Sequence, residues 1–116
     1  MRDRILLQLS RSDGLGIAVP ALTEVLYGIL LTPRAQENVQ EWERFQESFT
    51  YYQIDRSDAE KAANLQVALR KSGRQLATVD ALIATVAVRY DLTLLTSDKD
   101  FLAVPGLRQE NWLITS

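Results

Sequence analysis

Acidic side chains stand at three points of the sequence where an α/β sheet would form a ligand site. Glu24 lies in the first turns of a helix predicted after an apolar strand, and Asp80 lies near the start of an apolar helix. Asp98 directly follows a strand of the buried type. Because function in such sheets collects at the carboxyl ends of the strands, the three carboxylates are candidates for one site.

Converging carboxylates without a nearby Lys repel one another, and a hard divalent cation removes that repulsion. Mg²⁺ and Mn²⁺ favour oxygen ligands and keep several bound waters. Beside a phosphodiester, such an ion polarises a phosphoryl oxygen and lowers the pKa of an attacking water. Asp100 is a weaker fourth candidate, and the hydroxyls of Thr96 and Ser97 could hydrogen-bond a ligand carboxylate or a phosphate.

Each acid also has a structural interpretation of similar weight when it is taken alone. A glutamate in the first turns of a helix, as at position 24, interacts favourably with the helix dipole. Asp80 could cap its helix, with Thr78 as a rival cap, and Asp98 could belong to an Asx turn. The three acids together favour a site more strongly than any one of them.

Residue types that are missing from the sequence narrow its chemistry. The 116 residues include no His and no Cys, which excludes imidazole bases, Ser-His-Asp and Cys-His nucleophiles, and zinc held by Cys or His. The net charge of −2 argues against a basic protein that coats nucleic acid. Nucleic acid stays open as a substrate, since bound divalent cations can supply positive charge. A nucleotide cofactor has no support, because the sequence has no GxGxxG or P-loop motif.

The elements that must position these residues alternate between helices and short apolar strands. This order is typical of a three-layer α/β fold with a parallel sheet, and we expect one domain over residues 1–116. The predicted strands span residues 17–19, 51–54, 93–96 and 111–115. The predicted helices span residues 3–11, 21–31, 34–48, 57–71 and 78–90, with Thr32 and Ser57 as caps. No apolar run approaches the ~20 residues that span a bilayer, and no signal peptide is evident, so we expect a cytoplasmic protein without membrane contact.

Three acidic segments follow one another as TEVLYG (residues 23–28), DALIA (80–84) and LLTSDKDF (94–101). In this order they resemble the PIN-domain family, in particular its VapC-type toxin ribonucleases, and the resemblance covers nearly the whole chain from about residue 15. It implies RNA cleavage with Mg²⁺ or Mn²⁺ held by acidic residues, matched here by Glu24, Asp80 and Asp98, with Asp100 at the edge of the pattern. It also implies a homodimer and a cognate antitoxin.

The opening of the sequence departs from the family pattern. The family begins with a central strand ending in Asp-Thr-Asn or Asp-Thr-Ser, whose Asp is a metal ligand, and Asp3 is not a convincing substitute. Residues 1–11 instead resemble the helix that follows that strand. We therefore expect a PIN-like domain that is short by one strand, with weak or absent cleavage. A gap beside residues 17–19 or 93–96 should then be covered by another segment or by a partner chain.

Two other functions stay open. A PIN fold without its first ligand could be a non-catalytic binding module that acts only in protein association. A phosphorylation-receiver fold ranks last, because its acidic pair and its separate Asp cannot be placed at strand ends. A cluster of aromatic residues is as consistent with packing inside the chain as with a homodimer or an antitoxin complex. These residues are Trp42, Phe45, Phe49, Tyr51 and Tyr52.

Overall fold

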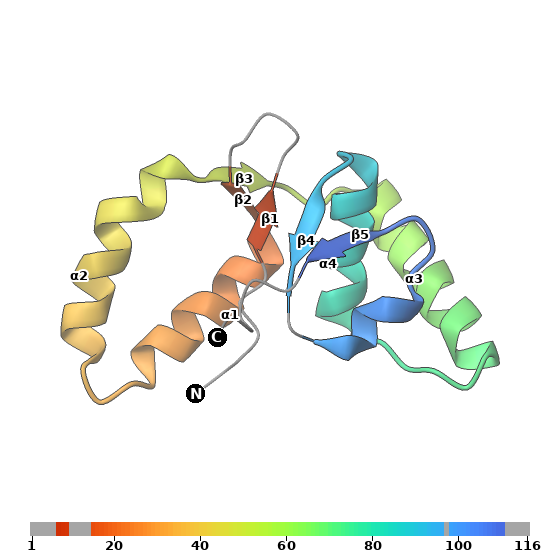
Figure 1. Cartoon of the computed structure of the whole chain (residues 1–116), viewed down its shortest axis with the longest axis horizontal. Coiled ribbons are helices and arrows are strands. Elements are labelled where there is room, and N and C mark those ends of the chain that lie inside the picture. Colours follow the sequence, from red (N-terminus) through yellow and green to blue (C-terminus); the bar gives the residue numbers. More distant parts are fainter. Residues whose placement is uncertain (1–6, 10–14, 97, 111–116) are drawn as a thin grey trace.

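The computed structural model describes residues 7–9, 15–96 and 98–110 (Figure 1). These residues form a five-stranded sheet with the strand order β3-β2-β1-β4-β5. The strands are β1 (Leu7–Leu9), β2 (Leu15–Ala18), β3 (Thr50–Tyr52), β4 (Thr93–Leu95) and β5 (Arg108–Glu110). β2 and β3 pair in parallel, as do β4 and β5, whereas β1 lies antiparallel between β2 and β4. The expected α/β fold with short parallel strands is confirmed.

β1 corrects one prediction and confirms another. Residues 7–9 were expected in a helix, but they form a strand in which Gln8 pairs with Gly16 of β2 and Leu94 of β4. The apolar spacing of residues 3–11 favours a helix locally, yet an empty place between two strands leaves backbone N–H and C=O groups unpaired. Pairing on both sides outweighs the local preference. Another segment thus covers the gap beside β2 and β4, as expected.

The remaining strands lie near their predicted places and differ at their ends. β2 begins at Leu15 and β3 ends at Tyr52, because the residues after β3 lead into the cap of the next helix. The strand predicted at 111–115 lies outside the described residues. β5 precedes it and pairs with β4.

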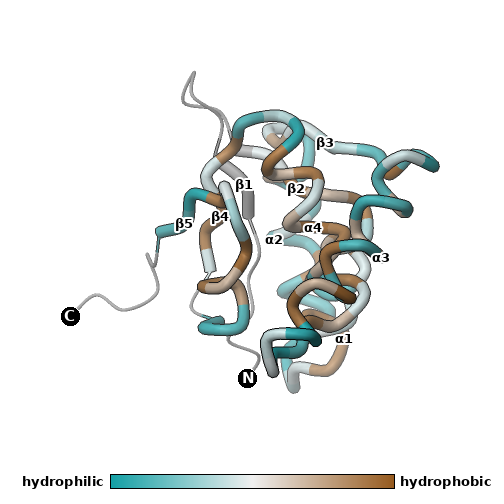
Figure 2. The backbone as a smooth tube through the Cα atoms, turned by 90° about the vertical axis from the view of Figure 1, so that its right-hand side faces the viewer, coloured by the Kyte–Doolittle hydropathy of each residue, from teal (hydrophilic) through white to brown (hydrophobic). Residues whose placement is uncertain are grey.

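The helices follow their predicted positions closely. They are α1 (Val19–Leu30), α2 (Ala35–Phe45), α3 (Arg56–Lys71) and α4 (Thr78–Arg89), with short 3-10 helices η1 (Gln46–Ser48) and η2 (Lys99–Ala103). α4 contacts both β4 and α3 and lies between the sheet and α3 (Figure 2). α1 leaves the end of β2 and contacts α2 and α4, while α2 extends to one side of the molecule (Figure 1).

Two of the predicted helix caps are wrong. The side chain of Asp55 accepts the N–H of Asp58 at 2.9 Å, and the side chain of Asp58 accepts the N–H of Asp55 at 3.0 Å. This reciprocal pair, rather than Ser57, opens α3, because it satisfies two backbone donors at once. The hydroxyl of Thr32 donates to the carbonyl of Ile29 at 2.7 Å, so Thr32 closes α1 and does not cap α2.

The buried core forms around α4. Ala81 and residues 83–87 are buried, as the apolar surface of this helix predicts. Ile17 of β2, Leu94 of β4 and Phe101 of η2 are fully buried in the same core. This packing fixes the first turn of α4 beside the carboxyl ends of the strands. Within the described part of the chain, no helix combines the length and the apolar character that crossing a bilayer requires.

Candidate metal centre

Glu24 lies in the second turn of α1, which follows β2 directly. Pro20 suits the start of this helix, because its fixed φ is helical and a first-turn N–H has no partner within the helix. The side chain of Glu24 is partly buried, and its Oε1 is buried without a hydrogen bond among the described residues. Such an oxygen costs free energy unless a donor or a cation reaches it. Glu24 therefore has a property expected of a ligand.

Asp80 lies in the first turn of α4 and is 1% exposed. The N-cap of this helix is Ala77, and no side chain caps the helix. The structural alternative, in which Asp80 or Thr78 is the cap, is therefore wrong. The carboxylate lies at the positive end of the helix dipole, which stabilises its charge. Because α1 and α4 contact each other, Glu24 and Asp80 belong to neighbouring helices.

Asp98 follows β4 and has the turn role that its structural interpretation predicted. Its Oδ1 accepts the N–H of Asp100 at 2.9 Å and caps η2. Its own N–H donates to Oγ1 of Thr96 at 3.0 Å, and the N–H of Thr96 donates to the carbonyl of Glu110 at 3.0 Å. Thr96 thus positions Asp98 through the backbone. Ser97, predicted to act with Thr96, lies outside the described residues.

The residues present fit a magnesium or manganese ion in chemistry, although the ligands are not gathered beforehand. In residues 7–9, 15–96 and 98–110, no group of three or more acidic side chains could already hold a metal ion. Glu24, Asp80 and Asp98 come from α1, α4 and the turn after β4, and all three offer the oxygen donors that these ions prefer. The buried Oε1 of Glu24 has no competing hydrogen bond within the described chain, which suits a ligand role.

A cavity of about 410 Å³ opens beside this region, and sequence reasoning missed it. Its wall combines the end of α3, the residues that lead into α4, and the first turn of η2. The lining includes Gln66, Arg70, Arg74, Leu76, Ala77 and Asp100. The spacing of Arg70 and Arg74 was the available signal, but only the packing of α3 brings them near Asp100.

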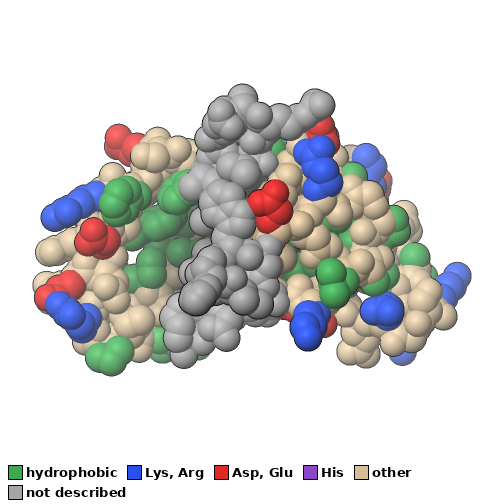
Figure 3. Space-filling view, viewed as in Figure 1, with side chains coloured by type: hydrophobic (Ala, Val, Ile, Leu, Met, Phe, Trp, Pro, Cys, Tyr) green, Lys and Arg blue, Asp and Glu red, His purple; other side chains and the backbone are tan. Residues whose placement is uncertain are grey.

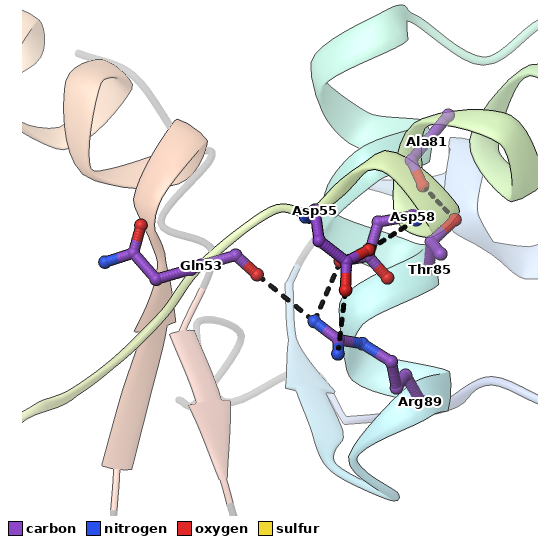
Figure 4. Close-up of polar contacts among 6 residues, drawn as sticks. All are labelled: Gln53, Asp55, Asp58, Ala81, Thr85 and Arg89. Atoms are coloured by element: carbon purple, nitrogen blue, oxygen red, sulfur yellow. Dashed lines mark hydrogen bonds and ion pairs between the residues drawn. The ribbon is translucent and has the colours of Figure 1, made fainter.

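A second polar cluster, also missed, joins the first turn of α3 to the last turn of α4 (Figure 4). Arg89 forms ion pairs with Asp58 at 2.8 Å and with Asp55 at 3.5 Å, and it donates to the carbonyl of Gln53 at 3.2 Å. The guanidinium also lies 4.3 Å from the ring centre of Tyr90. Because Asp80 is at the opposite end of α4, this cluster holds the helix in place and is separate from the candidate ligands.

The aromatic residues between 42 and 52 pack largely inside the chain. Trp42 stacks on Phe49 with ring centres 5.4 Å apart, and the hydroxyl of Tyr51 donates to the carbonyl of Gln46 at 2.6 Å. Only Phe45 of this group is mainly exposed. Figure 3 shows hydrophobic side chains gathered on an apolar face between α1 and α2. The large hydrophobic residues that are exposed on these two helices and at the end of α1 are Tyr27, Leu30, Leu31 and Phe45.

Comparison with known proteins places this geometry in context. The family model of the PIN domain matches residues 2–107. VapBC2 from Rickettsia felis, bound to a promoter DNA fragment, is 25% identical with a TM-score of 0.73, over 84% of this chain and 74% of that chain. DNA-bound VapBC from Salmonella typhimurium is 25% identical with a TM-score of 0.72, over 83% and 74%. VapBC-5 from Mycobacterium tuberculosis is 28% identical with a TM-score of 0.65, over 82% and 78%. No curated protein is significantly similar to the chain.

Proposed function

The chain belongs to the PIN domain family, and from this premise we propose that it is a metal-dependent endoribonuclease of the VapC toxin type. The observation that carries the proposal is the buried Oε1 of Glu24, which lacks a hydrogen bond among the described residues. It lies on a helix that contacts the helix of the buried Asp80. The structural likeness to VapBC proteins supports the same activity class.

In this proposal Glu24, Asp80 and Asp98 hold Mg²⁺ or Mn²⁺, directly or through water, and Asp100 is a further ligand at the rim. The ion, when bound, lowers the pKa of a water that attacks the phosphodiester. Thr96 holds the backbone of Asp98, and Ser97 is proposed to hydrogen-bond a carboxylate or a phosphate. The positive end of the α4 dipole favours negative charge at Asp80, and a bound cation would do the same.

The test is Mn²⁺-dependent cleavage of a structured RNA. We expect weak cleavage by this chain, and loss of it in Glu24→Gln and Asp98→Asn, because each substitution removes a charged oxygen ligand. Glu43→Gln on the exposed face of α2 is the matched control and should cleave like the parent. A second arm adds an N-terminal strand that ends in Asp, which should raise the activity. Cleavage that is unchanged in both ligand variants would overturn the mechanism.

A non-catalytic binding module is the second candidate. It is favoured by the finding that no three acidic side chains of the described chain are already grouped for a metal ion. In that case neither this chain nor the extended one cleaves RNA with Mn²⁺, while binding of a protein partner persists. The cleavage assay therefore separates the two candidates.

We propose a cognate antitoxin as the partner, with homodimer formation and action in the cytoplasm. The structures similar to this chain include VapBC toxin-antitoxin proteins, and the exposed apolar face between α1 and α2 suits a partner. Leu30→Arg puts a charge on that face without touching the buried core. We expect the variant to fold normally and to lose antitoxin binding by calorimetry and dimer formation by light scattering. If Leu30→Arg keeps the antitoxin affinity and the molar mass of the parent, this face is excluded as the interaction surface.

A further inference from the structure

The cavity beside the candidate ligands is lined by two arginines whose charges are not neutralised in the described chain. Arg70 lies in the last turn of α3 and Arg74 lies just beyond its end, and both are exposed. No ion pair or side-chain hydrogen bond joins either guanidinium to another described residue. In a protein of net charge −2, such a pair makes a local positive region.

The backbone around the cavity is held by specific hydrogen bonds. The N–H of Arg74 donates to the carbonyl of Leu69 at 2.9 Å, which gives α3 a Schellman ending. This ending needs the left-handed φ of +78° at Gly73. One turn before Arg70 on α3, Nε2 of Gln66 donates to the carbonyl of Leu76 at 2.9 Å and to Oγ1 of Thr78 at 3.2 Å. The backbone at the end of α3, which carries both arginines, is therefore held in place relative to the start of α4.

Two further features of the wall concern anions. Ala77, the uncapped N-cap of α4, lines the cavity, so the positive end of a twelve-residue helix dipole begins there. Asp100 lines the same cavity and is the acidic neighbour of Asp98. The cavity is thus basic at the end of α3 and acidic toward the candidate metal ligands. Both kinds of contact can serve a phosphodiester chain: cationic side chains neutralise its backbone, and acidic residues hold a metal ion at the scissile group.

We propose that Arg70 and Arg74 bind a backbone phosphate of the RNA next to the phosphodiester at the acidic site. This inference rests on the proposed function for the identity of the polyanion. Arginine suits the task because its guanidinium makes bidentate hydrogen bonds to phosphate. Basic residues at the end of a helix also complement its dipole, but that role acts on stability and leaves RNA affinity unchanged.

The test measures affinity without cleavage. Binding of a labelled single-stranded RNA is followed by fluorescence anisotropy in EDTA, over a range of salt concentrations. Arg70→Ala and Arg74→Ala should each weaken binding similarly for different sequences, and should reduce the slope of log affinity against log salt by about 0.7 to 1. Arg74→Lys should restore part of the affinity. Asp100→Asn should tighten binding, since it removes a negative charge from the wall.

Arg56→Ala is the matched control, because Arg56 lies at the other end of α3 and its removal changes the net charge equally. It should keep the parental salt slope, and thermal unfolding should verify that every variant is folded. Equal affinity and slope in the parent, Arg70→Ala and Arg74→Ala would overturn the proposal, as would an equal loss in Arg56→Ala. If RNA is never cleaved but the arginine variants still bind it more weakly, the proposed function fails and the phosphate contact stands.

Discussion

Arg89 in the last turn of α4 pairs with Asp58 in the first turn of α3 at 2.8 Å. The Asp58 side chain is fully buried, whereas the Arg89 side chain keeps 29% of its exposure. The two helices are therefore tied at one end by charge, while Gln66 ties them at the other end through Leu76 and Thr78. Because Asp80 begins α4, both ties determine where this candidate ligand lies.

Removing Arg89 should destabilise the protein strongly. Arg89→Met leaves the buried carboxylate of Asp58 without its cation, and breaking a buried pair in this way costs about 3–5 kcal/mol. We expect the low end of that range, because Arg89 is partly exposed. Urea unfolding measures the change. Arg56→Met is the control, since Arg56 pairs with Glu60 on the surface and should change the free energy by less than about 1 kcal/mol. Similar losses in both variants would contradict the structural role of the pair.

The free energy of unfolding should depend on pH through the carboxyl group of Asp55. Its hydrogen bond from the backbone N–H of Asp58, helped by the charge of Arg89, lowers the pKa of the Asp55 carboxyl below its ordinary value of 3.8. A lowered pKa contributes stability above the unfolded pKa, and that contribution is lost as pH falls through the folded pKa. Asp55→Asn keeps a capping oxygen but cannot titrate. The parent should be more stable than Asp55→Asn at neutral pH, and the difference should vanish in acid. A difference that is constant over a pH series of urea unfolding would contradict this.

Gly16 should not tolerate a side chain. An added Cβ would overlap the ring of Tyr52 and would lie 3.0 Å from the carbonyl oxygen of Thr50. The ring of Tyr52 also packs on Tyr90, with centres 4.8 Å apart, so it cannot move freely. Gly16→Ala should lower the free energy of unfolding by about 1–3 kcal/mol, the usual cost of overpacking. In a Tyr52→Leu background the same substitution should cost less, and an equal cost in both backgrounds would argue against the overlap.

Manganese should stabilise the folded chain through Glu24. A ligand that binds only the folded state at about 100 times its Kd adds about 2.7 kcal/mol, which raises the melting temperature. We expect Glu24→Gln to reduce this gain, because the variant loses the charge on its buried carboxyl group. Glu43→Gln, on α2, should gain as much as the parent. Scanning calorimetry with and without Mn²⁺ provides the measurement. If Mn²⁺ raises the melting temperature of Glu24→Gln as much as that of the parent, Glu24 is not a metal ligand.

Local patterns predicted α1 to α4 well because these helices depend on their own residues. The apolar surface of residues 81–88 predicts burial of α4, and the short buried strand before Asp98 predicts the turn that follows it. The cap of α3 was misplaced because Ser57 and Asp55 are both good capping residues. The choice between them depends on the reciprocal bond to Asp58, which the spacing of Asp55 and Asp58 could have indicated.

Features that depend on distant segments could not be predicted in the same way. β1 pairs Leu9 with Thr93, and no local pattern contains that information. The cavity likewise joins Arg70 of α3 to Asp100 of η2, which meet only through packing on α4. For the candidate ligands, the sequence indicated residue types and strand ends. It also indicated the turn at Asp98, in which one carboxylate oxygen accepts the N–H of Asp100.

The place between β2 and β4 can hold only one strand. β1 lies antiparallel there, so its first residue, Leu7, is paired with Leu95 at the end of β4. A parallel strand in the same place would bring its last residue to that edge instead. An engineered chain with an added N-terminal strand therefore has two mutually exclusive occupants for one position. When the added strand occupies this position, residues 7–9 leave the sheet and can form the helix that their spacing favours. The added strand then acts as a conformational switch between two pairings of one sheet.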